Sequence, residues 1–405
     1  MSSRRWPLRP LGDCAKFLSG GTPSKARTEF WDGDIPWVSS GEMTESRIHD
    51  SSLHITPEAA EDGSRLVPEN TVLAVVRGMS LAKEFRVSIT KREVAFNQDL
   101  KAFACKPDVD PEFLYYALFA QREHIRQLAT EASHGTKKLE TDTLARVGIP
   151  LPKLPIQQRT VEVACTYDEL MENNRRRMGL LENAARLLYE EWFVRLRFPG
   201  HEHTPITHGL PKGWGRTLLE EVAEFRLGKM LDQEKNRGDL LPYLANVNVR
   251  WGRFDLGDLR EMRFEHDEME TFGLKFGDIV MCEGGEPGRC AIWKEEQPGI
   301  MIQKALHRIR CREGMNHEYL YQCLRNQGES GQLATLFTGA TIKHLPREKL
   351  AKVMVVVPPA QLLDIFVDYT RPIENQLRTL AIQNQKLRAA RNLLLPRLMS
   401  GEIEV

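Results

Sequence analysis

The residues best suited to chemistry in this chain are small and basic, and they gather in two short loops. The first loop is Gly135-Thr136-Lys137-Lys138, and its counterpart about 205 residues later contains Thr341–Lys343. Small residues let a backbone approach a phosphate closely, while hydroxyl and ammonium groups donate hydrogen bonds to its oxygens. These loops predict contacts with a phosphate backbone rather than catalysis.

Two windows of basic residues support the same interpretation. Residues 77–106 hold seven basic against three acidic residues, and residues 289–312 hold six against two. A single basic strand is as often a solvated face, but two windows at equivalent places favour a duplicated surface for a polyanion. The predicted DNA-contacting residues are Arg77, Lys83, Arg86, Lys101, Thr136, Lys137, Lys138, Arg289, Lys304, Arg308, Thr341 and Lys343.

Signatures of catalysis are missing from the sequence. There is no Gly-x-x-x-x-Gly-Lys-Ser/Thr loop for ATP and no Gly-x-Gly-x-x-Gly turn for a dinucleotide. The stretch Gly20–Lys25 resembles a phosphate loop, but its proline and its spacing favour a turn. Neither a methyltransferase motif of the Asn-Pro-Pro-Tyr type nor a nuclease cluster of carboxylates and lysine is present. We therefore predict no catalytic residue and a chain that is not itself an enzyme.

Metal and disulfide chemistry is also disfavoured. The chain has seven cysteines, an odd number, and no two of them are spaced Cys-x-x-Cys, which argues against a disulfide framework or a structural zinc site. The cluster His201-Glu202-His203 with His208 could hold a metal, but it lies in a linker-like stretch where solvated histidines are common. We expect no metal.

Length and composition predict two to three domains and a chain outside the membrane. The 405 residues are 41% hydrophobic, no apolar run approaches the ~20 residues of a membrane span, and the basic N-terminus lacks the apolar region of a signal peptide. We expect a cytoplasmic protein. Its 56 basic and 56 acidic residues give a net charge of zero, so any attraction for nucleic acid has to be local.

The elements that must position the two loops are duplicated. When the sequence is shifted by 205 to 208 residues it matches itself in order, as expected for a tandem repeat. Matching pairs include Trp6 and Trp214, Phe17 and Phe225, Gly78 and Gly285, Gln98 and Gln303, and Pro152 and Pro358.

The sequence pattern of each half predicts a mixed α/β (α+β) domain followed by a long helix. Short apolar runs predict strands, and they are interrupted by one helical segment, Pro111–Leu128 in the first half and His317–Leu336 in the second. We predict a division into two globular domains, each followed by a long helical region. In order these are residues 1–152 (domain), 153–199 (central helix), 200–357 (domain) and 358–405 (C-terminal helix).

The two long helices carry apolar stripes that need a partner. In the first, from about Ile156 to Arg197, we take the stripe to begin at Val163, Tyr167 and Leu170; the second alternates steps of four and three from Phe366 to Leu398. Such seams can bury each other as a coiled coil, or each can pack on its own domain. Pro372 should kink the second segment or mark its true start. The predicted seam and partner-docking residues are Leu170, Asn174, Met178, Leu181, Leu188, Ile373, Leu377, Leu380, Asn384 and Leu387.

With these features in place, the chain resembles the specificity subunit of Type I restriction–modification systems over essentially its whole length. The resemblance rests on motifs that occur in order near the start, at the end of the first domain, at the entry to the first helix and at the C-terminus. These are Phe17–Ser24, Trp31–Val38, Ile149–Pro152, Pro155–Arg159 and Leu393–Ile403. The second half departs from the pattern at Pro242-Tyr243 and Ala360-Gln361, which leaves the details of its half-site open.

The resemblance implies two target-recognition domains held apart by two conserved helical regions, whose helices form an antiparallel coiled coil with pseudo-two-fold symmetry. It implies sequence-specific binding of double-stranded DNA at a bipartite target. It also implies two modification (methyltransferase) subunits that dock on the helices and methylate adenine, and two restriction subunits that translocate and cleave DNA. S-adenosylmethionine, ATP and Mg²⁺ would then be bound by those partners and no cofactor by this chain. The main alternative is a scaffold that joins two protein partners without reading DNA, and a stand-alone restriction or methyltransferase enzyme is disfavoured by the missing motifs.

Overall fold

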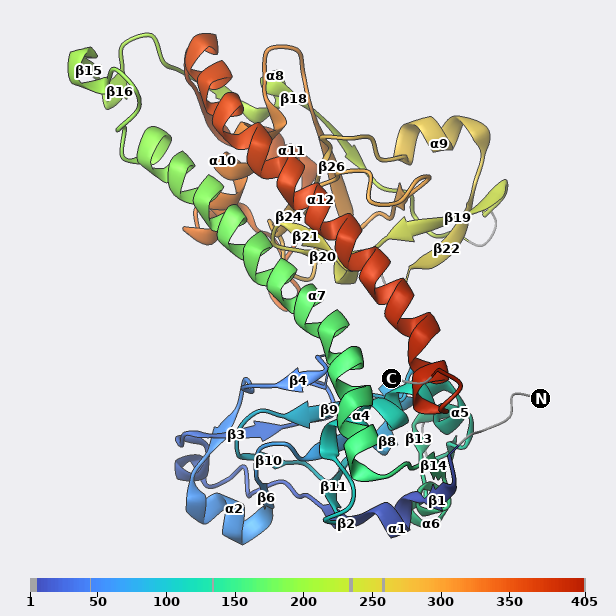
Figure 1. The fold of residues 1–405 in the computed structure, drawn as a ribbon. Helices are drawn as coiled ribbons and strands as arrows, with labels where there is room; N and C mark the ends of the chain where they lie inside the picture. Colours follow the sequence, from blue (N-terminus) through green and yellow to red (C-terminus); the bar gives the residue numbers. More distant parts are fainter. Residues whose placement is uncertain (1–5, 44, 133–134, 233–235, 257–258, 404–405) are drawn as a thin grey trace. The chain divides into compact units, whose positions relative to one another are not determined.

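The computed structural model describes residues 6–403, apart from residue 44 and residues 133–134, 233–235 and 257–258 (Figure 1). The chain forms two compact units that are discontinuous in sequence. Unit 1 comprises Met1–Glu172 with Asn384–Val405, and unit 2 comprises Asn173–Gln383. Among the described helices, none combines the length and apolar character needed to cross a membrane.

Unit 1 is built on two mixed sheets. One has the strand order β2-β11-β7-β9-β4 and the other the order β5-β3-β10-β6. Their central strands are continuous apolar runs because both faces are covered; all four residues of Val72–Val75 are buried,. The strands are β2 (Ala15–Ser19), β3 (Ile35–Val38), β4 (Arg47–Ile48), β5 (His54–Ile55), β6 (Leu66–Val67), β7 (Val72–Val75), β9 (Val87–Thr90), β10 (Val94–Phe96) and β11 (Leu100–Cys105).

A buried helix, α4 (Pro111–Ala120), fills the core of unit 1. Its N-cap Asp110 accepts a hydrogen bond from the Phe113 N–H at 2.9 Å, and a proline follows at the first helical position, both common start signals. The predicted single helix Pro111–Leu128 is interrupted at Gln121, whose φ of −97° and ψ of 7° are not helical. The remaining short helices are α1 (Leu11–Cys14), α2 (Pro57–Gly63), α3 (Ser80–Lys83), α5 (Arg122–Gln127) and α6 (Thr141–Ala145).

Both ends of the described chain lie in unit 1. Strand β1 (Leu8–Pro10) pairs with β14 (Gly148–Pro150), and Trp6 and Ile403 pack against the same hydrophobic core. A Cβ at Gly401 would lie 2.7 Å from the Trp6 ring, so only glycine allows this approach. The two ends are therefore neighbours.

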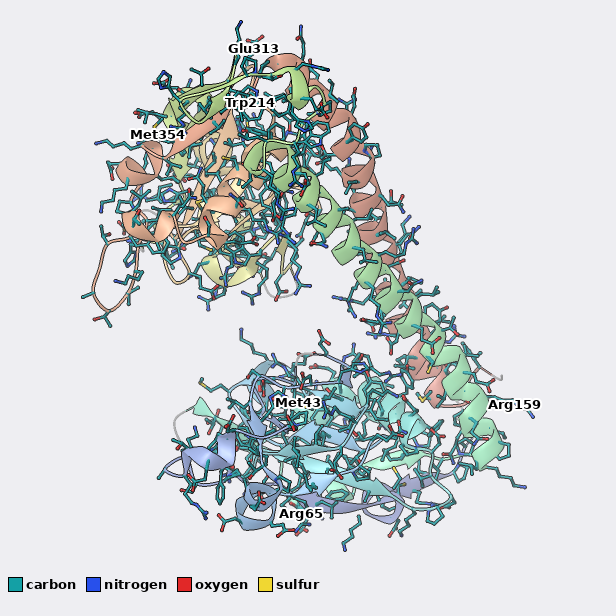
Figure 2. All side chains as sticks on the ribbon, turned by 90° about the vertical axis from the view of Figure 1, so that its left-hand side faces the viewer. Met43, Arg65, Arg159, Trp214, Glu313 and Met354 are labelled. Atoms are coloured by element: carbon teal, nitrogen blue, oxygen red, sulfur yellow. The ribbon has the colours of Figure 1, made fainter. Side chains whose placement is uncertain are left out.

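Unit 2 repeats the plan with the sheet orders β18-β26-β23-β24 and β22-β19-β25. Its strands are β15 (Ile206–Thr207), β16 (Leu210–Pro211), β17 (Gly215–Leu218), β18 (Ala223–Leu227), β19 (Asp239–Leu244), β20 (Val249–Arg250), β21 (Arg253–Phe254), β22 (Arg260–Phe264), β23 (Ile279–Cys282), β24 (Cys290–Ile292), β25 (Met301–Ile302), β26 (Leu306–Cys311) and β27 (Met354–Val357). Its helices are α8 (Leu219–Val222), α9 (His266–Phe272), α10 (His317–Glu329) and α11 (Arg347–Ala351). Trp214 packs on Phe193 and Phe198 in the core, whereas Met354 lies at the surface (Figure 2).

The strand registers support the sequence repeat residue by residue. In unit 1 Ala15 pairs with Cys105, and in unit 2 Ala223 pairs with Cys311. The parallel pair Trp37 and Ala95 has its counterpart in Tyr243 and Met301. Because registers depend on backbone hydrogen bonds rather than on side-chain similarity, this agreement indicates a true duplication. The predicted fold class, two mixed α/β domains each followed by a long helix, is confirmed.

The long helices α7 (Leu154–Tyr189) and α12 (Ala360–Met399) run side by side in opposite directions within each unit (Figure 1). In unit 1 the Asn384 amide on α12 donates to the Met171 carbonyl on α7 at 3.3 Å, and in unit 2 Trp192 and Phe366 lie 6.0 Å apart. Of the two alternatives for Pro372, a kink or the start of the second helix, the start is excluded, because α12 begins twelve residues earlier. The proline is tolerated at an exposed position.

A π-helical turn, Glu190–Val194, ends the first long helix. A π turn is wider than an α turn, and here Trp192 and Phe193, which are adjacent in sequence, are both buried in the core of unit 2. The helices begin near the predicted boundaries 153 and 358, but each compact unit contains half of both helices. The two compact units do not test the predicted division into four consecutive segments, which stays a prediction.

A buried polar network ties the first domain to both helices in unit 1. Asp168 on α7 accepts hydrogen bonds from the Tyr116 hydroxyl at 2.8 Å and from the Arg391 guanidinium on α12 at 2.5 Å. On α4, Glu112 forms ion pairs with Arg47 at 3.0 Å and with Lys91 at 2.6 Å. Each buried carboxylate thus has a cation in contact, as buried charges require.

Candidate nucleic-acid interface

The basic loop of the first domain forms one edge of a small three-stranded sheet. Strand β13 (Lys137–Lys138) pairs with β12 (Thr130–Glu131) on one side and with β8 (Arg77–Gly78) on the other. Lys138 lies opposite Arg77, and Lys137 lies opposite Gly78. We call this sheet with its connecting residues the first basic corner. It brings together predicted residues that are about 60 positions apart in the sequence.

The lysines of the first basic corner are held by weak, exposed ion pairs. Lys137 lies 3.3 Å from Glu131 and Lys138 lies 2.8 Å from Glu140, with side chains 31–85% exposed. Exposed pairs of this kind contribute little stability. Either ammonium can therefore exchange its carboxylate for a phosphate at small cost. Thr136 precedes them and is half-buried.

The other predicted cations of unit 1 are arranged less tightly. Lys83 ends α3, a helix that packs on β8 and β13, so it lies beside the first basic corner. Arg86 pairs with Glu84 at 3.4 Å. Lys101 on β11 donates to the Ser19 hydroxyl at 2.5 Å and so is engaged with β2 rather than with the corner.

Unit 2 presents the equivalent loop on a hairpin that we call the second basic corner, residues 338–344. Thr338 pairs with His344, and His344 pairs with Gly284, which is the counterpart of Arg77 in the strand register. Thr341 and Lys343 lie on the exposed part of this hairpin. The His344 imidazole lies 3.1 Å from a Glu283 carboxylate oxygen, which holds the base of the hairpin on the sheet.

Two predicted residues of unit 2 have to be corrected. Arg308 is only 7% exposed and its guanidinium donates to the Thr271 and Gly273 carbonyls, both at 2.9 Å. Arg289 is 9% exposed and donates to the Asn246 carbonyl at 2.9 Å. Both guanidinium groups hold the backbone of unit 2 together, so we withdraw them as DNA contacts. Lys304, in contrast, is exposed in the turn between β25 and β26.

Sequence reasoning from charge alone missed uncharged neighbours of both corners. Ser40 faces Gly78, and its repeat counterpart Asn246 donates to the Gly284 carbonyl at 3.4 Å. Met79 is 73% exposed beside the first corner, and Ile342 is 62% exposed on the second. Amides bind adenine edges and apolar groups contact thymine methyl groups. A search for polar or apolar residues at the ends of the basic windows could have found them.

The predicted helix seam is correct on α12 and partly wrong on α7. On α12, Leu377 and Leu380 are buried, and Ile373, Asn384 and Leu387 are half-buried. On α7 the prediction holds for a set of residues that are buried or half-buried, namely Asn174, Met178, Leu181 and Leu188. Leu170, however, is 45% exposed, and the seam position belongs to Met171.

Comparison with known proteins finds similar chains in one family. Residues 4–183 match the family model of the Type I restriction modification DNA specificity domain. The chain is 25% identical over 429 residues to the Type I restriction enzyme MjaIX specificity subunit of Methanocaldococcus jannaschii, covering 99% of this chain and 94% of that one. It is 31% identical over 164 residues to the EcoR124I/EcoR124II specificity subunit of Escherichia coli, covering 40% of this chain and 41% of that one.

The fold has a counterpart among solved structures. The S subunit of a Type I restriction–modification system from M. genitalium superposes with a TM-score of 0.53 at 17% sequence identity, covering 98% of this chain and 97% of the other. At this identity the likeness supports the fold alone.

Proposed function

We propose that the chain is a specificity subunit of a Type I restriction–modification system and that it directs a methylation and restriction complex to a bipartite site in double-stranded DNA. The recognition itself is its function. Methylation of adenine and cleavage would be carried out by two modification and two restriction subunits, which would bind S-adenosylmethionine, ATP and Mg²⁺.

One observation carries the bipartite target: the basic corner occurs twice, at equivalent registers of two equivalent domains. In each copy a lysine-bearing segment lies beside a strand end that contains glycine: Lys137 faces Gly78 in the first copy, and His344, next to Lys343, faces Gly284 in the second. Glycine leaves room for a nucleic-acid backbone, and lysine neutralises phosphates without reading bases. Two such surfaces in one chain imply two half-sites.

The helices are the proposed docking surface for the modification subunits. Several large apolar side chains on α7 and α12 point away from the seam; Leu180 is 70% exposed and Leu393 is 75% exposed. Leu170, which is outside the seam, belongs to the same group. Exposed apolar side chains of this size on neighbouring helices suit a partner protein better than solvent.

Charge reversal in the first basic corner tests the proposal. In the double variant Lys137→Glu and Lys138→Glu, affinity for the target DNA should fall and the slope of log K against log salt should decrease by up to about 1.8, because each lost phosphate contact removes ~0.9. The matched control is Lys16→Glu with Lys106→Glu. These exposed lysines lie near the C-terminal end of β11. The first basic corner lies at the opposite end of that strand, where the Arg77 N–H donates to the Asp99 carbonyl.

The control variant should retain the wild-type affinity and salt slope. If the Lys137 and Lys138 variant also retains both, these lysines are ordinary surface residues. If the wild-type chain, alone and with its partner subunits, shows no salt-dependent DNA binding at all, the scaffold alternative is correct. Mapping methylated adenines in DNA treated with the reconstituted complex then gives the two half-sites directly.

A further inference from the structure

A small cavity of about 30 Å³ in unit 2 contains an unusual group of buried polar side chains. It is lined by residues of α7, α10 and α12 and by Lys294, which follows β24. Three of its polar neighbours, His317 and Glu318 on α10 and Glu374 on α12, place one donor atom each within 4.8 Å of one another. Among the described residues no other group of histidine, cysteine and carboxylate side chains is gathered in this way.

The three donor atoms have no hydrogen-bond partner. His317 Nε2, Glu318 Oε1 and Glu374 Oε1 are all buried and unbonded, and Glu318 is 8% exposed as a residue. The His317 Nε2 atom lies 3.7 Å from Glu374 Oε1, too far for a hydrogen bond. Buried polar atoms are nearly always satisfied, so three such atoms that face one another form a group able to accept a ligand.

The imidazole is held in position by its surroundings. Its ring packs edge-on against Phe276 with centroids 5.5 Å apart, and a Cβ at Gly277 would lie 3.1 Å from Nδ1. Nδ1 therefore faces the Gly277 backbone, and Nε2 is directed to Glu374. Ligands that are fixed in this way by neighbouring groups are typical of metal sites.

The repeat shows what the same position does in unit 1. Counterparts of Glu318 and Glu374 are Glu112 and Asp168, and both are neutralised by direct ion pairs, Asp168 by Arg391. In unit 2 the position of Arg391 is occupied by Ala185, which lines the cavity. Because no arginine stands at this position, Glu318 and Glu374 adjoin the small cavity instead of an arginine from the long helix. The histidine of the cluster, His317, stands at the position of Pro111.

Neither of the two cations that line the cavity takes over that role in contact. Arg325 pairs with Glu329 at 2.7 Å. Lys294 corresponds to Lys91 in the strand register and lies near both carboxylates, but no ion pair within 4.0 Å joins it to either in the described part of the chain. The cluster is thus a poorly compensated group of charges.

We propose that His317 Nε2, Glu318 Oε1 and Glu374 Oε1 bind one divalent transition-metal cation, for which Zn²⁺ is the probe. One imidazole and two carboxylates form a donor set that suits Zn²⁺ and its neighbours rather than Ca²⁺. Two ligands at 2.0–2.1 Å from tetrahedral zinc are about 3.4 Å apart, so the 3.7 Å separation of His317 and Glu374 needs only a small closure. The cation would fasten α10 of the second domain to α12, as Arg391 fastens the first domain. The site departs from the sequence expectation of no metal.

The test uses the full chain, stripped with a chelator and titrated with Zn²⁺ by calorimetry, with Co²⁺ absorption as a spectroscopic readout of coordination. The expected result is one Zn²⁺ per chain, a Zn²⁺-dependent rise in the melting temperature, and a visible Co²⁺ spectrum. Variants His317→Ala and Glu374→Gln should bind at least about 100-fold more weakly, since even residues that only support a ligand cost 10–100-fold. Lys294→Met should bind more tightly, because it removes a competing charge.

The matched control is the double variant His201→Ala with His203→Ala, which removes the exposed linker histidines that sequence alone suggested as ligands. It should bind Zn²⁺ like the wild-type chain. The proposal is overturned if the wild-type chain binds no Zn²⁺, in which case Lys294 is the counter-ion. It is also overturned if His317→Ala and Glu374→Gln fold and bind as the wild-type chain does, or if the linker variant is the one that loses binding.

Discussion

Removing Arg391 should expose how much of the stability of unit 1 depends on the buried network. In Arg391→Met the side-chain stem that stacks on Phe119, with the guanidinium carbon 4.7 Å from the ring centre, is largely kept, but Asp168 loses its cation. The two side chains are 11% and 8% exposed. Breaking a buried pair on one side costs about 3–5 kcal/mol.

The lower end of that range applies here, because Asp168 keeps its hydrogen bond from the Tyr116 hydroxyl. Unit 1 has 172 plus 22, or 194, residues, and for a unit of this size 1 kcal/mol corresponds to about 2–4 °C. Arg391→Met should therefore lower the melting temperature of unit 1 by about 6–12 °C. Calorimetry of the full chain measures the shift, and hydrogen exchange of the β11 amides assigns the transition to unit 1.

Two further variants decide whether the reasoning is correct. Asp168→Asn in the Arg391→Met background should recover most of the loss, since a neutral amide can still accept from Tyr116 without requiring a cation. Arg388→Met, an exposed arginine on the same helix, should change stability by less than about 0.5 kcal/mol. A loss below about 1 kcal/mol in Arg391→Met, or no recovery in the double variant, would refute the account of the network.

Three other outcomes follow from the fold and the proposed function. The isolated chain should neither methylate nor cut DNA and should not bind S-adenosylmethionine; turnover by a pure preparation would contradict the recognition role. A circular permutant that joins the termini and opens the chain within residues 201–209 should fold and bind DNA, because Trp6 and Ile403 pack on one core; failure to fold would argue against it. Replacing residues 1–150 with the equivalent domain of a relative should change one half-site of the methylated target and leave the other unchanged, and a change in both would show that the domains do not read independently.

The fold was largely accessible from the sequence because a repeat constrains two copies at once. The step pattern of α12 from Ile373 to Leu387 gave the correct seam, since its buried positions are mostly apolar. On α7 the same approach chose Val163 and Leu170, one residue before the buried Ala164 and Met171. The error arose because the position between them is Asp168, a buried carboxylate that an apolar pattern cannot register.

The candidate surface was predicted less well, because charge in a sequence does not report burial. Lys137, Lys343 and their loops can be recognised from small residues beside lysines, and the structure gives these loops equivalent places. Arg308 has the same charge but lies on a central strand, where it bonds to carbonyls. The His317 cluster could not be found from the sequence, because its third member, Glu374, lies 56 residues after Glu318 on a different helix. The second clue is a missing residue: Ala185 stands where the first unit has the neutralising Arg391.

The division of both long helices between the units has a consequence for synthesis on the ribosome. The core of the first domain includes Leu395, Leu398 and Met399, so it cannot be completed until nearly the whole chain has been translated. Unit 2, which ends at Gln383, can close first. At ~5–20 residues per second, the first domain waits on the order of ten seconds or more after its own residues emerge, with an incomplete apolar surface. The two cores can therefore be completed only in the reverse of the order in which their domains are synthesised, and we expect chaperones to bind the nascent first domain.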